Sequence, residues 1–292
     1  MDYILHLGIL ICIYTILAQS LSLVAGYSGQ MSLAHAGFYG IGAYTTALLS
    51  VNFGLPVLLT IPIALLLSGI IAYIVSKVAV KTIDDYYIII TLGIQVVIFS
   101  IMNNWQDLTR GPLGIPGIPS FEVFSFSFDS KISFLLLSVF FTALVWFVLK
   151  NITTSPFGRM LRALSEDEVY TKSLGKNVGQ AKVVSFVISG MLASIAGVLY
   201  AHYISYIDPT SFTIDESIFI LSIVIIGGMR NLKGIFLAAT FLVLLPEALR
   251  FVGMPSSIAA NMRQIIYGIA LIMVVYQMGE KRKQRKLENA NA

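Results

Sequence analysis

Charged side chains are scarce in this chain of 292 residues, where Asp, Glu, Lys and Arg together account for 12%. A soluble domain has roughly 25% charged and 45–50% apolar residues. Here 57% of residues are hydrophobic and the mean hydropathy is +0.85. A water-soluble body is therefore excluded, and we expect most of the chain to lie in lipid.

Cysteine and histidine are also too few, or too scattered, for familiar kinds of site. The single cysteine, Cys12, lies in the first apolar stretch, which excludes a disulfide framework and a thiolate metal cluster. His6, His35 and His202 form no metal-binding motif, and the chain has no P-loop and no Gly-x-Ser-x-Gly sequence. We therefore expect no enzyme activity, no metal and no cofactor.

Two further absences narrow the class of protein. The net charge of +4 and the pI of about 9.0 come without any nucleic-acid-binding motif, and the basic residues flank apolar stretches, so we expect no nucleic-acid partner. Ionisable residues are almost absent from the middle of the apolar stretches, where ion-coupled carriers usually place them. The energy source for any transport is then expected outside this chain.

The apolar stretches predict an all-α polytopic membrane protein. A bilayer core about 30 Å thick needs about 20 helical residues, and the start of the chain lacks the basic region of a signal peptide. Residues 217–229 and 36–51 are short for a full crossing and are expected to be broken or re-entrant. The nine expected transmembrane helices cover residues 4–25, 36–51, 55–76, 86–103, 132–149, 180–203, 217–229, 235–250 and 263–278.

The distribution of basic residues predicts the orientation, because Lys and Arg accumulate on the cytoplasmic side. Most of the 19 lysines and arginines lie in one set of alternate loops, and only Arg110, Lys131, Arg250 and Arg263 lie in the other. The N-terminus is therefore expected outside and the C-terminus in the cytoplasm. Residues 1–278 would form the transmembrane domain and 279–292 a basic cytoplasmic tail near anionic lipid.

The longest polar interval, residues 150–182, contains two predicted short helices. Ser155 and Pro156 are typical of a helix start, which predicts a helix over 157–164. Ser165 and Glu168 have the spacing of a capping box, and Gly175 is placed to end a second helix over 166–174. These helices are interpreted either as a rigid dock for a soluble partner or as interfacial helices resting in the headgroup layer.

Polar residues also interrupt the membrane region. Residues 28–35 form a polar break whose His35 either satisfies broken backbone or lies on a substrate path. Gln95 is expected to bond between helices, and the nearby glycines at 37, 40 and 42 lack the context of a dinucleotide fingerprint and favour close helix packing. The candidate translocation-path residues are Gln30, Ser32, His35 and Gln95. On the opposite side, the prolines and glycines of 111–119 predict a compact lip without regular helix or central strand.

Several motifs, in this order, resemble those of one family. They are Gly-Gln-Met-Ser-Leu-Ala-His-Ala at 29–36, Gly-Ile-Gly-Ala-Tyr at 40–44, Thr91-Leu92 after Tyr86-Tyr87, Gly-Ile-Pro-Gly-Ile-Pro at 114–119, Ser-Pro-Phe-Gly-Arg at 155–159, Arg162-Ala163, Glu-Asp-Glu at 166–168, Leu174-Gly175, Gly-Gly-Met at 227–229 and Pro-Glu-Ala-Leu-Arg at 246–250. The chain is similar, from about residue 26 to 250, to the permease subunits of branched-chain amino acid ABC importers of the LivM type. It departs from that pattern at Arg110 and Leu113, where Gly and Asn are expected, and at Arg230-Asn231, where Gly-Ser is expected.

The resemblance implies an importer in a bacterial or archaeal inner membrane. A second homologous permease of the LivH type would complete the pore, two ABC ATPases would drive it, and an extracytoplasmic binding protein would deliver leucine, isoleucine or valine. The resemblance also favours the dock over the interfacial interpretation, and it implies an ATPase-coupling role for Arg159, Arg162, Ala163, Glu166, Asp167, Glu168, Tyr170, Leu174 and Gly175. A permease for urea or short amides is the nearest alternative, and a stand-alone channel or secondary carrier is the next.

Overall fold

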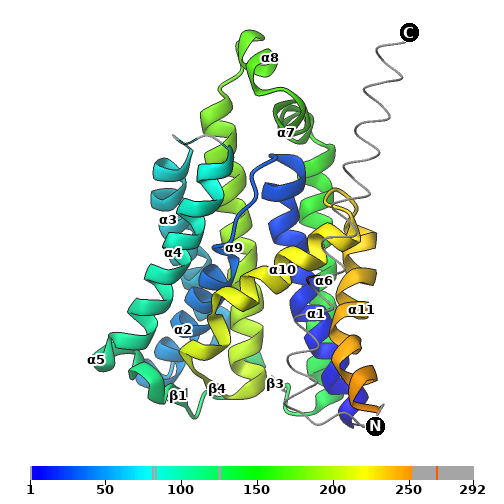
Figure 1. Ribbon diagram of the computed structural model, residues 1–292. Helices are drawn as coiled ribbons and strands as arrows, with labels where there is room; N and C mark the ends of the chain where they lie inside the picture. Colours follow the sequence, from blue (N-terminus) through cyan, green and yellow to red (C-terminus); the bar gives the residue numbers. More distant parts are fainter. Residues whose placement is uncertain (1, 81, 83, 124–125, 252–267, 269–292) are drawn as a thin grey trace.

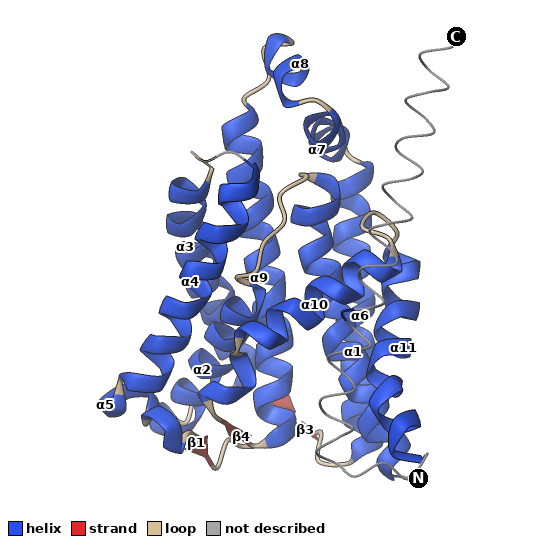
Figure 2. Ribbon diagram, viewed as in Figure 1, coloured by secondary structure: helices blue, strands red, loops and turns tan. Residues whose placement is uncertain are grey.

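The computed structural model describes residues 2–80, 82, 84–123, 126–251 and 268, and within these residues the protein is almost entirely helical (Figures 1 and 2). The helices are α1 (Asp2–Ser22, continued by a π-helical turn over Leu23–Tyr27), α2 (His35–Phe53), α3 (Val57–Ala79), α4 (Asp84–Asn104), α5 (Gln106–Thr109), α6 (Lys131–Thr154), α7 (Pro156–Glu166), α8 (Glu168–Ser173), α9 (Val178–Ile204), α10 (Ile214–Gly227) and α11 (Leu232–Phe251). Two 3-10 turns cover Gly111–Leu113 and Pro209–Phe212. The predicted all-α class is confirmed.

Five of the expected spans are helices long and apolar enough to cross a membrane. They are Asp2–Tyr27, Val57–Ala79, Tyr86–Asn104, Lys131–Thr154 and Val178–Ile204, which confirms a polytopic membrane protein. The expected span at 217–229 is the 14-residue helix α10, whose length of about 21 Å falls short of a bilayer core of about 30 Å. Figure 1 shows it crossing the molecule obliquely. The span expected at 263–278 and the tail at 279–292 lie outside the described residues, apart from residue 268.

Helices α1 and α9 form the centre of the bundle. About 72% of the apolar stretch of each is buried, compared with 22–33% for α3, α4 and α6, which therefore lie with most of their residues exposed on the outside of the bundle. Helices α2 and α9 pack so closely that a Cβ on Gly42 would lie 2.2 Å from the Ser194 carbonyl oxygen, and a Cβ on Gly197 2.1 Å from that of Tyr39. The glycines therefore serve close helix packing, as predicted.

The two ends of the bundle differ in architecture. At one end, the upper one in Figure 1, α7 and α8 project beyond the spans. At the other lie the start of α1, helix α5 and two small antiparallel pairs, β1 (Ile115–Pro116) with β4 (Tyr206–Ile207) and β2 (Glu122–Val123) with β3 (Phe126–Ser127). The lip predicted at 111–119 thus contains one 3-10 turn and one two-residue strand, because its prolines and glycines prevent longer elements.

The chain reverses inside the bundle between α1 and α2. Figure 1 shows residues 28–34 leaving the upper end of α1 and returning to about mid-height, where α2 begins. A helix that begins there presents its first N–H groups to the interior, where water is scarce and every such group needs a partner. The return precedes α2, which is itself a continuous helix of 19 residues, so a broken or re-entrant second span stays a prediction.

Candidate functional site

Helices α7 and α8 begin where local side chains cap them. The Ser155 hydroxyl accepts a hydrogen bond from the Gly158 N–H at 3.3 Å, and Pro156 occupies the first turn, which confirms the predicted start. The predicted capping box of Ser165 with Glu168 is wrong. Extended Asp167 (φ −152°) separates the helices, and its carboxylate accepts the Tyr170 N–H at 2.8 Å, while the Ser165 hydroxyl donates to the Arg162 carbonyl within α7.

Helix α8 is terminated at the glycine that the sequence predicts. Gly175 has a φ of +74° and its N–H donates to the Lys172 carbonyl at 3.0 Å, as expected of a glycine that terminates a helix. Ala163 is half-buried on α7.

Helix α7 is held against the bundle by its arginines. The Arg162 guanidinium donates to the Thr153 carbonyl at 3.2 Å and lies 5.3 Å from the centre of the Tyr27 ring, a cation–π distance. Arg159 donates to the Thr154 carbonyl at 3.3 Å. Arg162, predicted as a coupling residue, therefore faces the π turn at the end of α1.

Arg230 joins three segments that are far apart in the sequence. Its Nε donates to the Gly26 carbonyl at 2.8 Å, its Nη1 lies 3.2 Å from the Glu166 carboxylate, and its Nη2 donates to the Ser165 hydroxyl at 2.5 Å. The segments can meet because position 26 is glycine: a Cβ there would lie 1.9 Å from the Met229 carbonyl oxygen. In the sequence, Arg230 is one of the basic residues that predict the orientation and a departure from the LivM pattern, but no sequence signal identifies its distant partners.

Helix α8 has a buried anchor and an exposed apolar tip. Glu168, half exposed, pairs with Lys182 of α9 at 2.6 Å, and the Lys182 side chain is only 8% exposed, so removing Glu168 would leave a nearly buried cation without its partner. Val169 is 79% exposed, Tyr170 61% and Leu174 57%. Three neighbouring apolar side chains on an anchored projection are typical of a protein interface. Sequence reasoning selected Tyr170 and Leu174 but left out Val169.

The first N–H groups of the return segment and of α2 are satisfied by side chains from other helices. Thr91 accepts from the Leu33 N–H at 3.1 Å, Ser217 from the Ala36 N–H at 3.1 Å, and Gln95 from the Gly37 N–H at 2.6 Å. The Gln95 amide also donates to the Phe212 carbonyl at 2.8 Å. Gln95 thus bonds between helices, as expected, whereas Thr91 and Ser217 were missed because a hydroxyl in an apolar run gives no sign of its partner.

His35 is fully buried and bonds to Ser189 of α9 through Nε2 at 2.8 Å. The Ser189 hydroxyl proton is committed to the Ser20 carbonyl, 2.5 Å away, so the serine oxygen must accept and His35 must carry its proton on Nε2. The Nδ1 atom is then an acceptor, and no described group donates to it. His35 therefore links α2 through Ser189 to α1 beside the break.

The remaining candidate path residues also lie in the break. Gln30 accepts from the Ser28 hydroxyl at 3.0 Å, and the Ser32 hydroxyl accepts from the Ala34 N–H at 3.2 Å. Gln30 and Ser32 are buried, like His35 and Gln95. All four candidates are thus brought together around residues 28–37, and their contact with a substrate stays a prediction.

A second polar cluster lies at the opposite end. His202 donates from Nδ1 to the Pro119 carbonyl at 2.7 Å, so its Nε2 accepts from Thr46 at 2.9 Å. These bonds fasten the lip to α9 and α2. Among the described residues, no three His, Cys, Asp or Glu side chains gather as metal ligands would.

Comparison with known proteins identifies the family. Residues 3–275 match the family described as branched-chain amino acid transport system / permease component. The chain is 32% identical to the high-affinity branched-chain amino acid transport system permease protein LivM of Escherichia coli (strain K12), over 96% of this chain and 71% of that protein. It is 24% identical to LivH of Salmonella typhimurium, over 78% of this chain and 79% of that protein, and 26% identical to the ribose import permease protein RbsC of Haemophilus influenzae, over 82% and 75%. No solved structure is significantly similar. The chain therefore belongs to the family of branched-chain amino acid transport permeases, the membrane-embedded and non-catalytic components of such systems.

Proposed function

We propose that this chain is the LivM-like half of an ATP-driven importer of leucine, isoleucine and valine. The observation that carries this proposal is the 32% identity to a LivM permease across 96% of the chain. The pore would be completed by a second permease of the LivH type, for which the similarity to LivH proteins is the support. Two ABC ATPases and an extracytoplasmic substrate-binding protein would complete the assembly.

The proposed topology has nine transmembrane segments, with the N-terminus outside and the C-terminus in the cytoplasm of a bacterial or archaeal cell. Lys77 at the end of α3, the α7–α8 pair and Arg230 all belong to the upper end of the bundle in Figure 1. Arg110 and Lys131 belong to the opposite end. A cytoplasmic upper end agrees with the tendency of basic residues to stay on that side.

The α7–α8 pair would be the ATPase dock. Its exposed Val169, Tyr170 and Leu174 offer an apolar patch, and its helices are fixed to the bundle by Lys182 and Arg230. An anchored patch suits the transmission of force, since a loosely attached one would move without displacing the spans. The interfacial alternative would require these three side chains to lie in the headgroup layer.

The same contacts suggest how movement of the dock would reach the substrate path. Arg162 faces Tyr27, and Arg230 holds Gly26, so α7 touches the chain immediately before residues 28–34. Those residues lead into α2, beside the candidate path residues Gln30, Ser32, His35 and Gln95. Displacing α7 as the ATPases close would then pull on the break and alter the buried hydrogen bonds around it.

Uptake in a deletion strain tests the transport function. Expression of this chain with its partner subunits should restore import of radiolabelled leucine, isoleucine and valine, and ATP depletion should abolish it. Unchanged import of these amino acids together with loss of urea import on deletion would favour the urea or short-amide permease. Uptake that survives ATP depletion, with no ATPase copurifying, would favour a channel or secondary carrier.

The dock is tested by a pair of variants matched for exposure. Val169→Asp should reduce copurification of the ATPase at least tenfold, because it places a charge in the apolar patch. Leu113→Asp, at an equally exposed apolar residue on the opposite end, should leave copurification unchanged. Equal copurification with both variants would exclude α8 as the dock.

Transmission from the dock is tested at Arg230. Arg230→Ser removes the contacts to Gly26, Ser165 and Glu166. It should lower the rate of leucine, isoleucine and valine import, while the ATPase still copurifies with the chain. Lys233→Ser, an exposed basic residue near the same turn, is the matched control and should transport normally. Normal transport by Arg230→Ser would contradict the proposed route.

A further inference from the structure

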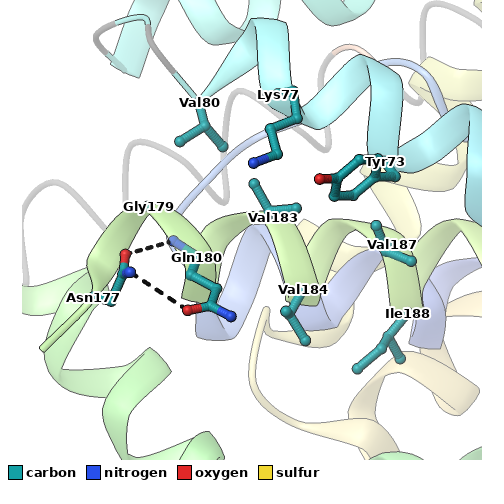
Figure 3. A pocket seen from close by; sticks show the side chains of 10 residues that line it. All are labelled: Tyr73, Lys77, Val80, Asn177, Gly179, Gln180, Val183, Val184, Val187 and Ile188. Carbon is teal, nitrogen blue, oxygen red and sulfur yellow. Dashed lines mark hydrogen bonds between the residues drawn. The ribbon is translucent and has the colours of Figure 1, made fainter.

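A groove lies between α3 and α9 at the α7–α8 end of the bundle, apart from both the proposed dock and the polar break. It has a volume of about 580 Å³, within the range of roughly 300–1,000 Å³ typical of small-molecule sites. Figure 3 shows its lining: Tyr73, Lys77, Val80, Asn177, Gly179, Gln180, Val183, Val184, Val187 and Ile188. Because both walls belong to membrane-crossing helices, the groove faces the space that lipid fills.

The helices separate toward this end, which creates the groove. Deeper in the bundle α3 and α9 touch directly: the Ser68 hydroxyl donates to the Gly190 carbonyl at 2.8 Å, and a Cβ on Gly190 would lie 3.0 Å from that of Ala72. From Tyr73 onward the facing residues are Val183, Val187 and Ile188, which line an apolar floor.

The groove is polar at one end only. Asn177 and Gln180 are bonded to each other at the start of α9, with the Gln180 N–H donating to the Asn177 side chain at 3.0 Å. Of the described residues that line the groove, Lys77 alone is charged, and its ammonium lies 5.2 Å from the centre of the Tyr73 ring. No carboxylate of the described residues pairs with Lys77. An apolar channel with a lysine at its membrane-surface end complements an acyl chain attached to an anionic headgroup.

We propose that this groove binds one anionic phospholipid from the leaflet at the α7–α8 end, with an acyl chain along Val183, Val187 and Ile188 and the phosphate beside Lys77. Basic pockets between membrane helices bind anionic headgroups in this way. The bound lipid would fill the space beneath Asn177, where α9 meets the turn from α8. Lipid retention by the isolated chain requires no ATPase and no substrate, so its failure and a failure of transport are distinguishable.

Native mass spectrometry of the purified full chain tests this site with equimolar phosphatidylglycerol and phosphatidylcholine. We expect one phosphatidylglycerol to be retained with a preference of about fivefold, the effect of one basic residue at a membrane surface. Lys77→Gln should reduce the preference to about one. Lys150→Gln is the matched control, because Lys150 also lies over an aromatic ring, 4.8 Å from the centre of Trp146, but does not line the groove.

Retained preference in Lys77→Gln, or an equal loss in Lys150→Gln, would overturn the site in favour of general surface attraction. A second measurement uses Tyr73→Trp in a chain whose two tryptophans are replaced by Trp105→Phe and Trp146→Phe. In bilayers, brominated phosphatidylglycerol should quench the introduced indole several-fold more than brominated phosphatidylcholine. Equal quenching by both lipids, or none by either because a protein segment fills the groove, would also overturn the site.

Discussion

At the scale of single residues, Gln95 shows how a polar side chain makes a broken helix tolerable in lipid. Gln95→Leu keeps the approximate volume but removes the donor to the Phe212 carbonyl and leaves the Gly37 N–H with only its longer bond to the Ala34 carbonyl, at 3.1 Å. We expect a loss of roughly 1–3 kcal/mol of unfolding free energy, the cost of one buried group left unsatisfied. Thermal unfolding in detergent measures it.

Gln19→Leu is the matched control for this prediction. Gln19 is equally buried, but its Oε1 accepts no hydrogen bond from any described residue, so the change should cost less than about 1 kcal/mol. Equal destabilisation by the two variants would mean that the bonds of Gln95 contribute nothing beyond its volume.

Arg110 has a backbone conformation that is unfavourable for a residue with a side chain. Its φ of +59° and ψ of +11° are left-handed, and this conformation costs a residue with a Cβ about 1–2 kcal/mol. Glycine, which the LivM pattern led us to expect there, avoids that cost. Arg110→Gly should therefore stabilise the protein by up to about 1 kcal/mol, partly offset by the greater freedom of glycine in the unfolded chain.

Differential scanning calorimetry compares this variant with Leu113→Gly, a nearby exposed position whose φ is not left-handed. Leu113→Gly relieves no backbone strain, so its melting temperature should equal that of the parent protein or be slightly lower. A lower melting temperature for Arg110→Gly than for the parent protein would show that the Arg110 side chain contributes more than its backbone costs.

At the scale of helices, the contact between α2 and α9 depends on the absence of side chains. Gly42→Ala would place a methyl group 2.2 Å from the Ser194 carbonyl oxygen, and separating two packed helices costs about 1–3 kcal/mol. Gly93→Ala on α4 is the matched control, because its Cβ would meet nothing within 4 Å. That change should be neutral or stabilising by up to about 1 kcal/mol. Comparable unfolding temperatures for the two variants would contradict the close packing.

At the scale of the whole molecule, the proposed orientation predicts opposite accessibility for the two ends. Val169→Cys and Leu113→Cys change equally exposed residues on the α7–α8 end and on the lip. In intact cells a membrane-impermeant maleimide should label the Leu113 variant, whereas the Val169 variant should react only after permeabilisation. Native Cys12 is buried and should remain unlabelled. The reverse pattern would invert the topology and remove the proposed dock from the cytoplasm.

The membrane class, the five long spans and the start of α7 follow from the amino-acid sequence alone. These features are local: an apolar run of sufficient length needs lipid whatever its neighbours are, and Ser155 caps the adjacent turn. The resemblance to LivM permeases was likewise carried by contiguous motifs, and the comparison with known proteins confirmed it.

Which distant groups contact one another depends on how the helices pack. Asp167 replaced Ser165 as the cap of α8 because the chain is extended at Asp167, and α10, already expected to be short for a full crossing, runs obliquely across the molecule. Arg230 found its three partners across more than sixty residues of chain. Such contacts depend on the relative placement of distant helices, which hydrophobic periodicity does not encode, because lipid accepts an apolar helix equally well in many positions.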